Sequence, residues 1–391
     1  MLDFNNTEIA FASKSNNDLR NAYILFKAMS SSVVVKAGKG VTEFATGIGF
    51  PLSWAVKPTL YRQFVGGETL QEASKTVGRL MGENIYSVLD YSSEGGKELS
   101  DVERTYNEIL RSIDNGGGNE AIAFTVFKPT GLIVGSVLEI ASLDEDGLND
   151  IERAELENFK NRFMALCRRA AEKGVRILVD AEHYYCQNLF DKLTEEAMAT
   201  FNKERVIVFH TLQMYRHDRL DYLRRIHKDA KDGGYKLGIK FVRGAYMEEE
   251  RERAVMMGYI SPICASKAET DLNYDNGLRY VMDNINEIEL FSGTHNYESN
   301  YLLAELINNK GITKADKRVW FSQLYGMSDN ITYALAREGY NVCKYIPYAP
   351  VKEVLPYLLR RAEENTSMAG QTGRELGLIK DEMNRRGIRL V

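Results

Sequence analysis

Residues 206–213 (VIVFHTLQ) and 237–244 (LGIKFVRG) are two short runs rich in apolar and β-branched residues. A charged segment with the composition of a helix separates them. Runs that are apolar along most of their length, rather than at alternate positions, are typical of strands buried on both faces. A strand, a helix and a second strand predict one βαβ unit of a parallel sheet.

The same pattern continues on both sides of this unit. Six further apolar runs lie at residues 87–92, 122–128, 175–182, 290–296, 318–326 and 341–348, and charged, helix-forming segments separate most of them. Eight parallel strands predict an α/β fold, a closed (β/α)8 barrel, which takes about 250 residues. The alternative is an open doubly wound sheet, which usually binds its ligand on a glycine-rich turn after the first strand. The chain contains no GxGxxG motif, and this favours the barrel.

The 391 residues are enough for one large domain or two ordinary ones. Residues 1–85 carry apolar positions at helical spacing and are expected to form a helical region. Residues 86–391 are expected to form the barrel with C-terminal helices. The uncharged run at residues 44–56 (FATGIGFPLSWAV) is shorter than the ~20 residues that span a bilayer. A helix packed on the main domain and a segment lying on a membrane surface are both open for it.

Composition excludes several classes of protein. Fifty basic residues against 55 acidic ones leave a formal charge of −5, so no nucleic-acid partner is expected. Four scattered cysteines without a CxxC pair exclude a disulfide scaffold and fit a reducing compartment. The first 20 residues lack the pattern of a secretory signal, and a cytoplasmic location is expected.

The active site of such a barrel forms at the C-terminal ends of its strands. Polar residues end almost every run, namely Lys128, Asp180, Glu182, His183, Gln213, Lys240, Arg243, Tyr246, Thr294, His295, Asn296, Gln323, Tyr325, Tyr345 and Tyr348. The next segment is helical and adds Tyr357, Arg360, Arg361 and Glu364. The arrival of these side chains at one rim predicts a functional site.

Two features of this rim allow more than one interpretation. Lys128 and Lys240 interrupt apolar strands, where a lysine needs a partner or a ligand. Each lysine is either a Schiff-base nucleophile or a charge partner for a bound anion. Arg360 and Arg361 are either a solvated helix face or a clamp for a carboxylate. The five histidines lack HxH and HxxxH spacing, so no metal site is expected, and no GxSxG elbow is present.

Five strings carry a resemblance to a known family. They are VDAEHYYCQ (179–187), GIKFVRGAY (238–246), GTHN (293–296), QLYGM (323–327) and YIPYAPVKEVLPYLLRRAEENTS (345–367). The chain resembles the flavin-dependent proline dehydrogenases, in particular the monofunctional, eukaryotic-type branch. The resemblance implies a distorted barrel, bound FAD, and oxidation of L-proline to Δ1-pyrroline-5-carboxylate with electrons passed to a membrane quinone. Peripheral contact with the inner face of the cytoplasmic membrane is an accompanying hypothesis.

The resemblance also implies roles for single residues. Asp180, Lys240 and Lys128 match catalytic positions, with Asp180 expected to orient Lys128. The residues expected to hold the substrate are Lys128, Leu324, Tyr345, Tyr357, Arg360 and Arg361. The residues expected to hold FAD are Gln213, Lys240, Val242, Arg243, Gly244, Ala245, Tyr246, Thr294, His295, Asn296 and Glu364. Gly244 and Ala245 are small and are expected to let the backbone approach a flat or phosphorylated ligand.

Two positions of this chain vary between members of the family. Many bacterial members have arginine where this chain has Lys240, whereas the eukaryotic-type branch has lysine. Relatives that act on hydroxyproline tend to have a smaller residue at the position of Tyr345, so tyrosine there favours proline.

Two other functions compete with the dehydrogenase. A Schiff-base aldolase or lyase would use Lys128 or Lys240 and would be colourless. A non-catalytic binding barrel would show no turnover. A dehydrogenase would be yellow and would bleach with proline.

Overall fold

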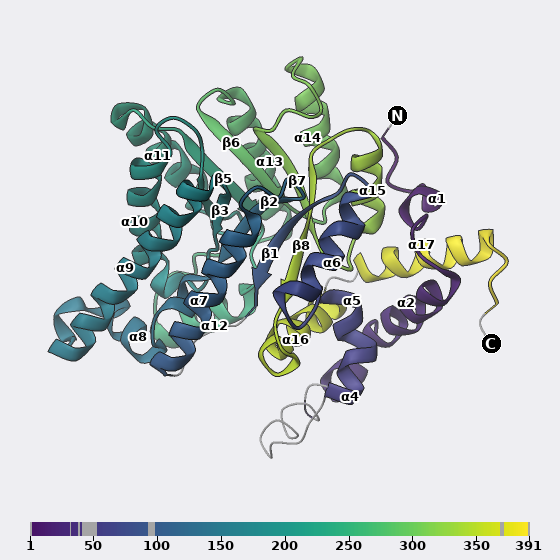
Figure 1. Ribbon diagram of the computed structural model, residues 1–391, viewed down its shortest axis with the longest axis horizontal. Coiled ribbons are helices and arrows are strands. Elements are labelled where there is room, and N and C mark those ends of the chain that lie inside the picture. The colour runs from purple at the N-terminus through teal and green to yellow at the C-terminus, as the bar shows by residue number, and fades with distance from the viewer. Residues whose placement is uncertain are drawn as a thin grey trace.

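The computed structural model describes residues 2–31, 33–37, 40, 53–92, 98–367 and 371–389. Eight parallel strands close into one barrel in the order of the sequence (Figure 1). They are β1 (Tyr86–Tyr91), β2 (Ile122–Phe127), β3 (Arg176–Val179), β4 (Val208–Gln213), β5 (Leu237–Val242), β6 (Ile288–Gly293), β7 (Val319–Leu324) and β8 (Val342–Tyr348). The predicted (β/α)8 barrel is confirmed, and the doubly wound alternative is wrong.

Every predicted run contains a strand, but several strands end earlier than the runs do. β3 stops at Val179, so Asp180 lies on the loop that follows, and β5 and β6 stop before Arg243 and Thr294. At these positions the backbone still bonds to the neighbouring strand, as in the Asp180 N–H to Phe127 oxygen at 3.0 Å and the Thr294 N–H to Ser322 oxygen at 3.1 Å. The side chains there turn to polar partners at the rim. The functional candidates therefore lie at strand ends and on the loops, as is typical of this fold.

Helices surround the barrel and extend it at both ends of the chain. Before the barrel lie α1 (Thr7–Ala10), α2 (Asn16–Met29), α4 (Ser53–Val56), the π-helical turn Lys57–Tyr61, α5 (Arg62–Phe64) and α6 (Leu70–Met81). Between the strands lie α7 (Leu99–Gly116), α8 (Gly135–Leu143), α9 (Asp150–Lys173), α10 (Tyr184–Phe201), α11 (Arg219–Gly233), α12 (Met247–Met257), α13 (Lys267–Asp283), α14 (Tyr297–Asn309) and α15 (Asp329–Arg337), with 3-10 turns at Pro129–Leu132 and Glu145–Gly147. After β8 come α16 (Val351–Ser367) and α17 (Gln371–Arg385).

Local signals explain where the long helices begin and end. Asn149 and Glu152 form a capping box at the start of α9, which satisfies two N–H groups that have no partner within the helix. Gly174 ends the same helix in the left-handed region, at φ 70°. Such caps fix the length of the helix and so set where β3 begins.

The interior of the barrel is filled at its N-terminal half by aromatic side chains. The Phe124 ring packs edge-on against Phe209, Phe291 and Trp320, with ring centroids 4.8–5.3 Å apart. The Arg176 guanidinium stacks over Phe124 and Trp320 and pairs with Glu289 at 2.9 Å. The barrel is therefore a packed core that is closed below, and the polar residues gather above this layer.

The two ends of the chain lie together beside the barrel. Figure 1 shows α17 alongside α2, although more than 340 residues separate the two helices. The Arg386 guanidinium, just after α17, donates to the backbone oxygens of Phe11 and Lys14 at 2.7 Å. Of the run at 44–56, only 53–56 lie within the described residues, and there the Trp54 side chain is 70% exposed. Among the described helices, none combines the length and apolar character needed to cross a membrane.

Gly326 lies where the N-terminal helices contact the barrel, and a substitution there tests how much this contact stabilises the fold. It adopts φ 80°, and an added Cβ would lie 2.0 Å from the backbone oxygen of Gln63. Gly311 has a similar φ of 65° with open space around it. We expect Gly311→Ala to lower the free energy of unfolding by about 1 kcal/mol through left-handed strain alone. Gly326→Ala should lower it by about 3 kcal/mol or more, because a backbone carbonyl must also move.

Urea denaturation of the two variants and the parent measures this difference. Equal losses for Gly326→Ala and Gly311→Ala would show that the close contact between residues 63 and 326 does not stabilise the fold.

Candidate active site

A buried ion pair joins strands β3 and β5 across the C-terminal mouth of the barrel. The Lys240 ammonium, on β5, lies 2.5 Å from Oδ1 of Asp180, on the loop after β3. The Tyr345 hydroxyl, on β8, donates to the other oxygen of Asp180 at 2.8 Å. The same Lys240 nitrogen lies 4.9 Å from the centre of the Tyr345 ring. Three predicted site residues from three elements therefore meet at one point.

A second ion pair lies beside the first and includes a residue that sequence reasoning missed. The Lys128 ammonium donates to both oxygens of Asp90 at 3.0 and 3.1 Å, and the Ser92 hydroxyl donates to Asp90 Oδ2 at 2.5 Å. The prediction named Asp180 as the residue that orients Lys128, and the structure adds Asp90 in this role. The signal that could have found it is an aspartate inside the apolar run at 87–92.

The two carboxylates sit in different electrostatic surroundings. Burial raises the pKa of Asp90 above its ordinary value; Lys128 opposes this rise, and Asp180 adds to it. Burial would also raise the pKa of Asp180, but Lys240 and Lys128 together hold it below its ordinary value. Burial and the negative charge of Asp180 raise the pKa of Tyr345 far above normal. Asp180 is therefore an ionised acceptor, with Tyr345 as a neutral donor.

The charges of this cluster balance. Two lysines face two aspartates, and Asp90 and Lys240 are only 1% and 5% exposed. A carboxylate ligand that enters such a site needs further positive charge, because a buried anion without a partner is strongly unfavourable. The arginines that follow β8 are suited to supply it.

Helix α16 carries the predicted clamp. Arg361 is 7% exposed, and its guanidinium carbon lies 5.1 Å from the ring centre of Tyr357, which is 5% exposed. Arg360, one residue earlier, is half-buried. Leu324 ends β7 and pairs in register with Tyr345, so it lies beside the same mouth. The Glu364 side chain lies outside the described residues.

The loop after β5 is tied to the start of α14. The Arg243 guanidinium donates to Asp271 Oδ1 at 2.7 Å, to Ser299 Oγ at 3.1 Å and to Thr294 Oγ1 at 2.6 Å, and it stacks 4.5 Å from the Tyr274 ring. As predicted from the strand alternation, Lys240 faces the interior of the barrel while Arg243 points to the surrounding helices. Arg243 thus joins two of the segments expected to hold the cofactor.

Gly244 lies where the structure has no space for a side chain. Gly244 adopts φ 134°, and an added Cβ would lie 2.4 Å from the Tyr215 ring. The side chain that requires glycine here is therefore Tyr215 of this chain. Ala245 is exposed, while Tyr246 packs on His183 with ring centres 4.2 Å apart.

Residues 294–296, which we call the cofactor segment, lead into α14. Asn296 caps this helix by accepting from the Ser299 N–H at 2.9 Å, and the N-terminus of a helix favours anions. Loss of solvent and the charges of Lys344, Arg361 and Arg243 lower the pKa of His295 to about 3, so its ring is neutral. Arg361 of α16 therefore acts electrostatically on the cofactor segment.

The two remaining cofactor candidates lie in strands. The Gln213 amide donates to the Glu182 backbone oxygen at 2.9 Å, and the Val242 backbone oxygen accepts from the Met214 N–H at 2.8 Å. Arg243 and the N-terminus of α14 lie beside them, and a guanidinium and the N–H groups of a helix N-terminus are the kinds of donor that bind phosphate groups. In the described part of the chain, no group of three or more His, Cys, Asp or Glu side chains could hold a metal ion.

The buried ion pair can be tested by a double-mutant cycle on Asp180→Asn and Lys240→Met. We expect a coupling free energy of about 3 kcal/mol, because each single change leaves a buried group without its partner. The exposed pair Arg224–Asp221, at 2.8 Å, is the control and should couple by less than ~0.5 kcal/mol. Chemical denaturation measures both cycles, and similar coupling in the two would contradict the proposed importance of burial.

Known proteins resemble this chain along most of its length. The proline dehydrogenase family matches residues 73–374. The carbapenem antibiotics biosynthesis protein CarD of Pectobacterium carotovorum subsp. carotovorum is 35% identical over 83% of this chain and 83% of its own length. The mitochondrial proline dehydrogenase 1 of Homo sapiens is 38% identical over 60% of this chain and 40% of its own length.

Solved structures show the same fold. The crystal structure of proline utilization A (PutA) from Bdellovibrio bacteriovorus inactivated by N-propargylglycine has a TM-score of 0.71 and 20% identity, and covers 93% of this chain. This chain spans 38% of the PutA chain, so the two share a barrel and differ in extent. Since the family match extends over more than three quarters of the residues and includes every strand of the barrel, the chain belongs to the proline dehydrogenase family.

Proposed function

We propose that the protein oxidises L-proline to Δ1-pyrroline-5-carboxylate, with FAD as the cofactor and a membrane quinone as the electron acceptor. The observation that carries the proposal is the charge-balanced cluster of Lys240, Asp180, Lys128 and Asp90 at the barrel mouth, next to an arginine-bearing helix. A site of this kind suits a small zwitterion, whose carboxylate needs added cations and whose ring needs an apolar wall.

The chain's own residues would bind and orient the substrate. Arg360, Arg361 and Lys128 would hold the carboxylate by charge-assisted hydrogen bonds, which fix one end of the ring. Tyr345, Tyr357 and Leu324 would then cover the ring and exclude water.

The reaction removes a hydride from the ring carbon that is bonded to nitrogen and carries no carboxylate. It also removes a proton from that nitrogen. FAD, when bound, supplies the hydride acceptor. Asp180 keeps its charge and fixes Lys240 and Tyr345, so both side chains stay in place while the substrate changes.

The ion pairs disfavour the lyase alternative. A Schiff-base lysine must offer a neutral amine to a carbonyl group. Here the nitrogens of Lys128 and Lys240 each contact an aspartate. These contacts suit charge partners for an anion better than nucleophiles.

Substrate choice and location complete the proposal. A Xenopus laevis relative named hydroxyproline dehydrogenase is 29% identical over 96% of this chain, so both substrates deserve a direct test. Position 345 holds a tyrosine rather than a smaller residue, and its hydroxyl is engaged with Asp180, which supports proline. A cytoplasmic location with peripheral membrane contact near residues 44–56 would bring the protein to its quinone.

An anaerobic visible spectrum tests the proposed reaction. We expect flavin absorbance that bleaches with L-proline and persists with trans-4-hydroxyproline. Bleaching with hydroxyproline alone would reverse the choice of substrate. A protein that stays colourless and inert after addition of FAD would contradict the dehydrogenase and favour the lyase, which borohydride trapping with a keto substrate would detect.

Arg361→Met tests the carboxylate clamp. We expect the KM for proline to rise about 100-fold, since a buried charge-assisted bond is lost, while FAD stays bound. The exposed Arg224→Met serves as the control and should leave KM unchanged. An unchanged KM in Arg361→Met would show that this arginine does not hold the carboxylate.

A further inference from the structure

The cofactor segment is held from behind by the turn between β7 and α15. His295 Nδ1 and Ser328 Oγ lie 2.9 Å apart and share a hydrogen bond. The Gln323 amide donates to the Thr294 backbone oxygen at 3.1 Å, and its own oxygen accepts from Thr332 at 2.8 Å. The position of the segment therefore depends on the first turn of α15.

Ser328, at the start of this turn, has an unusual backbone. Its φ is 48° and its ψ is 45°, in the left-handed region that non-glycine residues rarely adopt. The residue is 2% exposed, and its N–H donates to the carboxylate of Glu375 on α17. Without that acceptor a buried N–H would have no partner, which is strongly unfavourable. Glu375 thus supports the conformation that aims Ser328 Oγ at His295.

The neighbour of Glu375 contacts the other side of the cofactor segment. The Arg374 guanidinium carbon lies 4.1 Å from the ring centre of Tyr297, the first residue of α14. Two consecutive residues of α17 therefore touch the helix that follows the cofactor segment and the turn that supports it. This double contact links the docking of the C-terminal helix to the flavin site.

We propose that Glu375 is a positioning residue for the flavin, acting through Ser328 and His295 on the cofactor segment. The inference rests on the proposed function, because it takes the cofactor to be FAD held at residues 294–296. Its consequence is that α17, far from the reacting atoms, sets how tightly FAD is bound.

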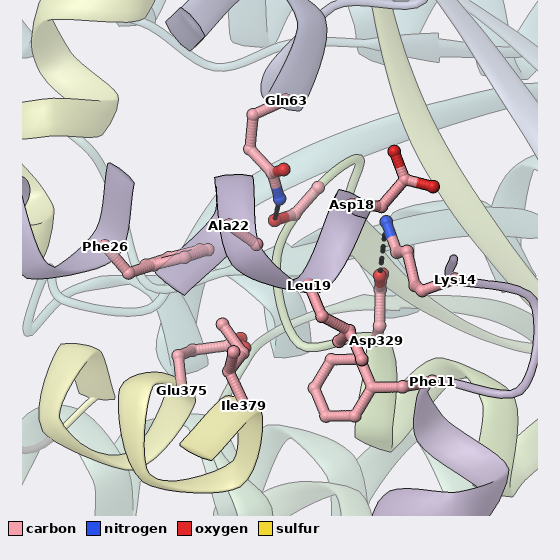
Figure 2. A pocket seen from close by; sticks show the side chains of 11 residues that line it. Phe11, Lys14, Asp18, Leu19, Ala22, Phe26, Gln63, Asp329, Glu375 and Ile379 are labelled. Atoms are coloured by element: carbon pink, nitrogen blue, oxygen red, sulfur yellow. Dashed lines mark hydrogen bonds and ion pairs between the residues drawn. The ribbon is translucent and has the colours of Figure 1, made fainter. Parts of the chain in front are cut away.

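The surroundings of Glu375 make this support depend on pH. Figure 2 shows Glu375 and Ile379 of α17 facing Leu19, Ala22 and Phe26 of α2, near the ion pair of Lys14 and Asp329. The charged and titratable groups that face Glu375 come from five places: Lys14 before α2, Asp18 on α2, Tyr297 on α14, Asp329 on α15 and Lys344 on β8. Lys344 is itself engaged with Asp329 at 2.9 Å.

Burial first, and then the charge of Asp329, raise the pKa of Glu375 from 4.5 to about 7. A raised pKa means that protonation stabilises the docked state. The stabilisation is fully present below the ordinary value and is lost as the pH rises through about 7. The support that Glu375 gives to Ser328, and with it FAD binding, should therefore weaken as the pH rises from 6 to 8.

The test measures release of FAD from the holoprotein by flavin fluorescence on dilution. Glu375→Ala removes the acceptor, and Ser328→Gly keeps the N–H and the left-handed backbone but removes the hydroxyl. We expect each to raise the dissociation constant of FAD about tenfold. Glu375→Gln retains an acceptor oxygen and should stay within about twofold of the parent at pH 6, without the parent's weakening towards pH 8.

Glu382→Gln is the matched control on the same helix. Glu382 is fully buried and pairs with Arg385 and Arg386 at 2.8 and 2.6 Å, away from Ser328. All variants are compared at a temperature where circular dichroism shows them folded. Glu382→Gln should lower the melting temperature and change FAD affinity less than about twofold.

Four results would overturn the inference. Equal losses of FAD affinity in Glu375→Ala and Glu382→Gln would mean that Glu375 contributes only to the general docking of α17. Unchanged affinity in Ser328→Gly would exclude the route through His295. A parent protein that binds no FAD at all would overturn the proposed function as well, whereas a parent that binds FAD with unaffected variants would overturn this inference alone.

Discussion

The ion pair between Lys240 and Asp180 is the interaction on which the site depends. It joins two strands that are not neighbours, and it holds Tyr345 from a third. The aromatic layer around Phe124 fills the barrel interior on the opposite side from the loop that carries Asp180. In this enclosed mouth a charge without a partner is very unfavourable. The result is a rigid, charge-balanced surface that can recognise a small zwitterion.

The same constraint explains why the site draws on elements beyond the barrel. The cluster carries no net positive charge, so a bound carboxylate would need the added charge of the arginines of α16. The cofactor segment is likewise held by α15, and α15 is held in turn by Glu375 of α17. Because α17 packs beside α2 (Figure 1), both ends of the chain contribute to a site that the strands alone would leave incomplete.

The strands and most rim residues could be predicted from the sequence, because buried parallel strands are apolar along their length and active-site residues follow them. The alternation in β5 correctly separated Lys240 from Arg243. Asp90 was missed since it sits within an apolar run, where one polar residue carries no indication of its partner. No local pattern indicates that the Tyr215 ring leaves no space for a side chain at Gly244. The contact of Glu375 with Ser328 joins residues 47 positions apart, and no local sequence pattern indicates it.

The central claim is that added cations above a neutral cluster anchor the substrate by its carboxylate. The most direct measurement compares anaerobic flavin reduction by L-proline with reduction by pyrrolidine, which has the same ring and no carboxylate. The account predicts that pyrrolidine needs a concentration at least about 1,000-fold higher, since several charge-assisted bonds are lost. Reduction by both compounds at similar concentrations would contradict it.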